Sequence, residues 1–67
     1  MTVIANLKTT LAGLKSAQAN LETFALSTDN QQAKQLYQDA AQQTHSIVDS
    51  LYPRVKQLEQ EEPQYKQ

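Results

Sequence analysis

The chain has 67 residues and no cysteine, and its six basic and seven acidic residues give a net charge of −1. A disulfide framework and a thiolate zinc site are therefore excluded as sources of stability. The charge also argues against the broad basic surface that binds phosphates, so we do not expect nucleic acid as a partner. A core of this size is marginal, because a short chain buries a smaller fraction of its surface than a long one. We expect association with another surface to complete it.

The sequence also argues against a membrane-spanning or exported protein. It contains no run of about 18 or more apolar residues, which is what a transmembrane helix needs. Residues 1–8 have neither a basic leader nor a continuous hydrophobic stretch, so we expect no export signal. The expected location is inside the cell.

Apolar residues recur at helical spacing from about residue 3 to about residue 27. With Ile4 at position a of a heptad, they fill most a and d positions and extend to g, whereas position e carries Lys8, Lys15 and Glu22. This pattern predicts one amphipathic helix over residues 3–27, with Thr2 as its N-cap.

Residues 28–30 are predicted to form a turn. The run from Ser27 to Asn30 is the only interior cluster of capping residues, and either Asp29 or Asn30 can cap a second helix. So short a connection makes the two helices antiparallel neighbours. The sequence therefore predicts an all-α, two-helix hairpin that forms one domain over residues 1–67.

The second predicted helix covers about residues 31–61 and contains Pro53. Proline in a helix interior removes a backbone hydrogen bond and usually kinks or ends the helix. The apolar positions on either side of this proline nevertheless stay in phase. We expect a kinked helix that continues past Pro53, with a break at Tyr52 as the alternative, followed by a tail over residues 62–67.

The apolar stripes of the two helices form the predicted seam. Each stripe spans three heptad positions rather than two, which is typical of a helix that touches two neighbours in a four-helix bundle. Two helices alone cannot cover stripes of this width, and a homodimer of hairpins could. The seam and oligomer interface are predicted to contain Ile4, Leu7, Leu11, Leu14, Leu21, Phe24, Leu36, Tyr37, Ile47, Val48, Leu51, Val55 and Leu58.

Antiparallel alignment about the turn predicts neighbours across the hairpin. Leu11 is expected near Ile47, and Leu21 near Leu36. Gln18 is a polar residue on the seam, where one buried polar side chain can fix the register of two helices. A rim position for Gln18 is an equal alternative, because a seam position alone does not establish burial.

No residue pattern predicts catalysis. No serine, threonine or tyrosine has an evident base partner, and no glycine-rich loop could hold a phosphate. His45 and Asp49 would need further ligands to bind a metal, and the Glu-x-x-His motif of ferritin-like carboxylate sites does not occur. We expect no enzyme activity, cofactor, metal site or small-molecule substrate.

Carboxylates gather where the second helix should end. The helix dipole disfavours negative charge there, and such a cluster is usually part of a solvated tail. The alternative is a docking peptide, in which a proline stops the helix and a tyrosine serves as an anchor. This possible docking tail consists of Glu59, Glu61, Glu62, Pro63 and Tyr65.

Three segments carry a resemblance to known proteins: residues 11–22, residues 32–35 and residues 53–66. The more specific pieces are Pro-Arg-Val at 53–55 and Glu-Glu-Pro-Gln-Tyr-Lys at 61–66. The chain resembles, over nearly its full length, a family of short proteins of unknown function from endospore-forming bacilli. Its members are often encoded beside SpoVA-type dipicolinate-channel genes and genes for small membrane proteins. The resemblance thus implies a role in spore formation, resistance or germination, and no activity or ligand.

The leading hypothesis is a non-enzymatic interaction module, a homodimeric four-helix bundle that serves a spore-related process and could dock a membrane-associated spore protein. Two alternatives remain open. The glutamine-rich composition would suit a storage or packing component of the spore. A dimeric nucleic-acid-binding hairpin ranks lower, because the basic residues are scattered along the chain.

Overall fold

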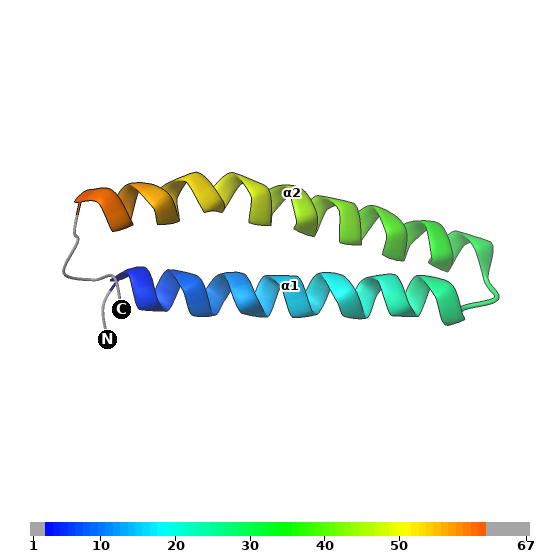
Figure 1. Ribbon diagram of the computed structural model, residues 1–67. Coiled ribbons are helices and arrows are strands. Elements are labelled where there is room, and N and C mark those ends of the chain that lie inside the picture. The colour runs from blue at the N-terminus through cyan, green and yellow to red at the C-terminus, as the bar shows by residue number, and fades with distance from the viewer. Residues whose placement is uncertain (1–2, 62–67) are drawn as a thin grey trace.

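The computed structural model describes residues 3–61. They form two α-helices, α1 (Val3–Ser27) and α2 (Gln31–Glu61), which lie side by side and run antiparallel (Figure 1). The molecule is a rod of 49 by 18 by 12 Å, two helices wide and one helix thick. The prediction of an all-helical hairpin is confirmed.

Hydrogen bonds in the turn fix where each helix ends and begins. The Thr28 N–H donates to the Phe24 carbonyl over 3.1 Å and closes the last turn of α1. The Ala33 N–H donates to Asn30 Oδ1 over 2.8 Å, so Asn30 is the N-cap of α2. The Asn30 N–H in turn donates to the Thr28 hydroxyl oxygen over 3.3 Å. The N-cap predicted for α1, Thr2, lies outside the described residues.

Helix α2 continues through Pro53, which lies on its exposed outer face. Proline has no N–H to donate to the Asp49 carbonyl one turn earlier, and on this outer face the carbonyl is open to water. Figure 1 shows α2 gently bowed along its length. The helix is unbroken at Tyr52.

The hydrophobic core lies in the half of the rod away from the turn. Its buried members are Ile4, Leu11, Val48, Val55 and Leu58, with Leu7, Leu14 and Leu51 partly buried against them. Nearer the turn, the buried residues are the alanines Ala25 and Ala41. Alanines bury little area, so most of the hydrophobic stabilisation comes from the half away from the turn.

Three residues that the sequence assigns to the seam are exposed in the single hairpin. Phe24 is 51% exposed, Leu36 is 64% exposed and Ile47 is 50% exposed. Val48, one position after Ile47, joins Leu11 in the core instead. The buried positions of α2 recur every seven residues through Val48, and the residue one step earlier is turned by about 100° around the helix axis.

Polar side chains on the seam form hydrogen bonds with residues of their own helix. The Thr44 hydroxyl donates to the Ala40 carbonyl over 2.8 Å. The Gln18 side-chain amide donates to the Glu22 carboxylate over 3.2 Å, and Gln18 is only half-buried. Gln18 therefore occupies a rim position. Across residues 3–61, every buried side-chain nitrogen and oxygen has a hydrogen-bond partner.

Candidate interaction surface

The two broad faces of the hairpin differ in the residues that border the seam. The seam positions that recur every seven residues are Ile4, Leu11, Gln18 and Ala25 on α1 and Lys34, Ala41, Val48 and Val55 on α2. On a helix, the residue four positions after such a position and the residue one position before it lie on opposite sides of it. The residues four positions after are Lys8, Lys15 and Glu22 on α1 and Gln38, His45, Tyr52 and Glu59 on α2. Contacts between these two sets place them on one face, which we call the polar face.

Two contacts join α1 to α2 across the polar face. Lys8 Nζ lies 2.9 Å from Glu59 Oε2. Lys15 Nζ lies 4.8 Å from the centroid of the Tyr52 ring, which is a cation–π contact. A step of seven residues forward along α1 matches a step of seven back along α2. These two contacts therefore define the antiparallel register of the helices.

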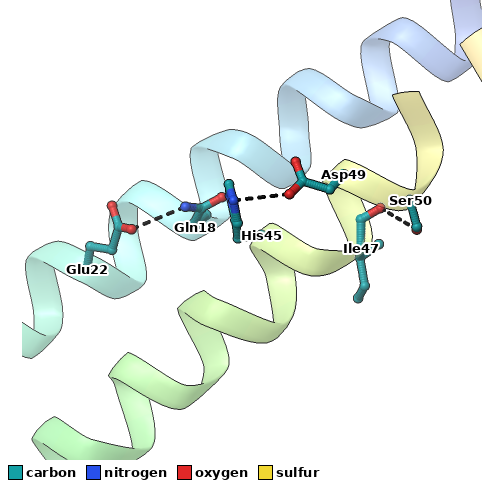
Figure 2. A network of polar contacts seen from close by, with 6 residues as sticks. All are labelled: Gln18, Glu22, His45, Ile47, Asp49 and Ser50. Carbon is teal, nitrogen blue, oxygen red and sulfur yellow. Dashed lines mark hydrogen bonds and ion pairs between the residues drawn. The ribbon is translucent and has the colours of Figure 1, made fainter. Parts of the chain in front are cut away.

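The polar face is hollowed into a shallow groove between the helices. Two adjoining hollows of about 420 and 430 Å³ share Gln18, Glu22 and His45 as lining residues. His45 Nε2 lies 3.2 Å from Asp49 Oδ2, and both side chains are more than half exposed. Figure 2 shows that the Gln18–Glu22 and His45–Asp49 pairs each join residues of one helix. Residues 3–61 contain no group of three or more His, Cys, Asp or Glu placed to hold a metal ion.

The opposite face, which we call the uncharged face, is formed by the residues one position before these seam positions. The residues three positions further along each helix lie beside them and belong to the same face. Its members are Thr10, Gly13, Ala17, Asn20 and Phe24 on α1 and Ala33, Leu36, Ala40, Gln43, Ile47 and Ser50 on α2. None of these residues carries a charge. Arg54 and Glu61 follow on the same side of α2, toward the end of the rod away from the turn.

Large apolar side chains on the uncharged face are open to solvent in the single hairpin. Phe24 is 51% exposed, and Leu36 and Ile47 are exposed to a similar degree. The Phe24 ring meets the Tyr37 ring edge-on, with 5.8 Å between the centroids. In Figure 2, the Ile47 side chain extends away from the side of α2 that carries His45. Exposed apolar residues grouped on one face, rather than scattered, mark an interaction surface.

Part of the predicted docking tail lies within α2. Glu59 and Glu61 belong to the last two turns of that helix, and Glu59 is paired with Lys8. Glu62, Pro63 and Tyr65 lie outside the described residues. The docking role of this segment stays a prediction.

The fold and its surfaces define a small helical-hairpin module with one polar and one uncharged broad face. Neither helix, over residues 3–61, combines the length and the hydrophobicity needed to cross a bilayer. The chain belongs to the family described as "Protein of unknown function (DUF1657)", whose model matches residues 7–55. The predicted membership in a family of unknown function is thus confirmed. No curated protein and no solved structure matches the chain.

Proposed function

We propose that this protein is a non-enzymatic, self-associating helical module that acts in spore formation, resistance or germination. The observation that carries self-association is the exposure of Phe24, Leu36 and Ile47 together on the uncharged face. Burial of apolar surface contributes about 25 cal/mol per Å², so covering these side chains stabilises an assembly. Two hairpins joined in this way form a four-helix bundle, in which each helix touches two neighbours.

A second copy of the hairpin suits the uncharged face better than a charged ligand does. The face offers no charge to pair with such a ligand, and two uncharged faces can meet without burying an unpaired ion. Small chains commonly complete their cores by oligomerisation. The core of this hairpin is large only in the half away from the turn, and the exposed Phe24 and Leu36 lie in the other half.

Co-expression of a tagged and an untagged copy tests self-association. The untagged chain should co-purify with the tagged one. Phe24→Glu in both copies should abolish co-purification, because a carboxylate would be buried without a partner. Thr23→Glu is the matched control, since Thr23 is the exposed neighbour on the outer face of α1. Circular dichroism would establish that both variants remain helical.

Two results of the co-purification would contradict self-association. The first is recovery of the tagged chain alone from the wild-type pair. The second is full co-purification of the Phe24→Glu pair.

The cellular part of the proposal places the protein inside the developing or dormant spore. Its support is the resemblance of residues 11–22 and 53–66 to short proteins of endospore-forming bacilli. Deleting the gene should lower spore yield, heat resistance or germination rate while leaving vegetative growth unchanged. Wild-type values for all three spore measurements would contradict this role.

A membrane-associated spore protein is the second partner that we propose. The support is again the resemblance, because members of that family are often encoded beside channel genes and genes for small membrane proteins. A pull-down with tagged protein from detergent-solubilised sporulating cells should enrich a membrane protein over an untagged control. Enrichment of soluble proteins alone would contradict the proposal of a membrane-associated partner.

A further inference from the structure

The seam between the two helices changes in composition along the rod. It consists of the positions that recur every seven residues and the positions three residues after each of them. In the open half of the rod, which we define as residues 3–14 and 48–61, every seam residue is a branched aliphatic one: Ile4, Leu7, Leu11, Leu14, Val48, Leu51, Val55 and Leu58. In the turn half, which we define as residues 18–44, four of the eight seam residues are polar or charged. The eight are Gln18, Leu21, Ala25, Thr28, Lys34, Tyr37, Ala41 and Thr44.

Burial of the seam follows the same division. In the open half, five of the eight seam residues are buried. In the turn half, only Ala25 and Ala41 are buried, and the other six are half-buried. Hydrophobic stabilisation is roughly proportional to the apolar area removed from water, so the turn half contributes much less of it than the open half. The Lys8–Glu59 ion pair also lies in the open half.

The larger apolar side chains of the turn half lie beside the seam rather than on it. Phe24 and Leu36 are 51% and 64% exposed on the uncharged face. The Phe24 ring joins α1 to α2 there through its edge-on contact with the Tyr37 ring. Lys34 occupies a seam position where the open half has valines, and a lysine at such a position costs stability.

The turn half is able to open without unfolding the open half. Without tertiary packing, helical segments of up to about 15 residues are marginal in water. The helical parts of the turn half, residues 18–27 and 31–44, are no longer than this. Opening them replaces a short connection by a longer one, and the cost of closing a loop rises only slowly with its length. The open half therefore loses little stability when the turn half opens.

We infer that the turn half opens and closes in the single hairpin and that association through the uncharged face holds it closed. This inference rests on the self-association proposed above and adds a means of regulating it. Phe24 belongs to α1 and Leu36 to α2, so only the closed form offers both side chains on one face. A partner that binds one of two forms shifts the population toward that form.

The fraction of closed hairpins then controls the affinity of association. An apparent dissociation constant equals the intrinsic constant divided by the fraction of molecules that are competent to bind. Both hairpins of a dimer must be closed, so this fraction enters twice. A change near the turn that never touches the partner is thus able to weaken or strengthen the dimer.

Hydrogen exchange of the wild-type chain tests this inference at two concentrations, one at which it sediments as a dimer and one at which it sediments as a monomer. In the dimer, the amide hydrogens of both halves should be protected. In the monomer, those of the turn half should exchange at least about tenfold faster than in the dimer, while those of the open half keep most of their protection. Leu36→Glu supplies the monomer if the wild-type chain stays dimeric at the lowest measurable concentration.

The N-cap of α2 gives a second test away from the partner surface. Asn30 lies in the turn, outside the uncharged face, and accepts a hydrogen bond from the Ala33 N–H. Asn30→Ala should raise the dissociation constant of the dimer by about tenfold or more, because it lowers the closed fraction of both hairpins. Glu59→Gln changes a contact between the helices in the open half and is the control. It should leave the dissociation constant within about twofold of the wild-type value.

The possible results separate this inference from the proposed function. Equal protection of both halves in the monomer would show that the turn half stays closed without a partner. Loss of protection in both halves would show that the hairpin unfolds as a unit. Either result, or a dimer that Asn30→Ala leaves unchanged, would overturn the inference and leave self-association standing. A wild-type chain that sediments as a monomer at every concentration would contradict the proposed function, and this inference with it.

Discussion

Lys8 Nζ and Glu59 Oε2 lie 2.9 Å apart and connect the second turn of α1 to the last turns of α2. The pair fixes the register of the hairpin at the end away from the turn. The side chains are 50% and 30% exposed, so water and dissolved ions screen the attraction between them. The pair therefore helps to specify the register more than it stabilises the fold.

A double-mutant cycle with Lys8→Ala and Glu59→Ala should give a coupling energy below about 1 kcal/mol, as is usual for exposed ion pairs. The coupling should decrease as salt is added, because the pair is open to solvent. Urea unfolding of the four chains, at one protein concentration and two salt concentrations, measures it. A coupling of several kcal/mol that does not respond to salt would contradict a screened surface pair.

Leu11→Ala should lower the free energy of unfolding by about 2 to 5 kcal/mol, because it empties a buried position in the core. Leu11 is 5% exposed. Leu26→Ala is the matched control on the same helix, since Leu26 is 84% exposed. The control should shift the free energy by no more than about 0.5 kcal/mol. Similar losses for the two variants in denaturant unfolding would be incompatible with the core described above.

Asn30→Ala should destabilise the hairpin by about 0.5 to 2 kcal/mol, because the Ala33 N–H loses its capping acceptor. Asn30→Asp keeps an acceptor oxygen and should retain most of the stability. Asp29→Ala changes the exposed neighbour and should have an effect below about 0.5 kcal/mol. A larger loss for Asp29→Ala than for Asn30→Ala in thermal unfolding would show that Asp29, and not Asn30, is the N-cap of α2.

Pro53→Ala should stabilise the protein, by up to about 3 kcal/mol, because α2 is helical on both sides of an exposed proline. The alanine restores an N–H that can donate to the Asp49 carbonyl. Ser46→Ala, seven residues earlier on the same outer face, is the control, and its effect should stay below about 0.5 kcal/mol. A loss of stability for Pro53→Ala would mean that the hairpin depends on a bend imposed by the proline ring.

The hairpin itself was predictable because its signals are local. The capping residues between Ser27 and Asn30 and the heptads on either side act over one or two helical turns. The choice between Asp29 and Asn30 as the N-cap was not predictable, because both residues can accept the hydrogen bond. Only the backbone geometry of the turn selects Asn30.

The two broad faces could be predicted in part. On the first helix, Lys8 and Lys15 at position e contrast with Ala17 and Phe24 at position g, and this contrast is visible in the sequence. On the second helix, the sequence did not show whether Ile47 or Val48 faces the first helix, because the two residues are adjacent and both apolar. Their assignment depends on how α2 is rotated against α1, which is a long-range property of the fold.

The central claim is self-association through the uncharged face, and sedimentation equilibrium of three chains tests it most directly. The wild-type chain of 7.5 kDa should sediment as a species of twice that mass. Leu36→Glu, on the uncharged face, should sediment as a monomer, whereas Leu26→Glu, an exposed leucine outside that face, should remain a dimer. A wild-type monomer at every concentration, or a dimer that Leu26→Glu dissociates and Leu36→Glu does not, would contradict the claim.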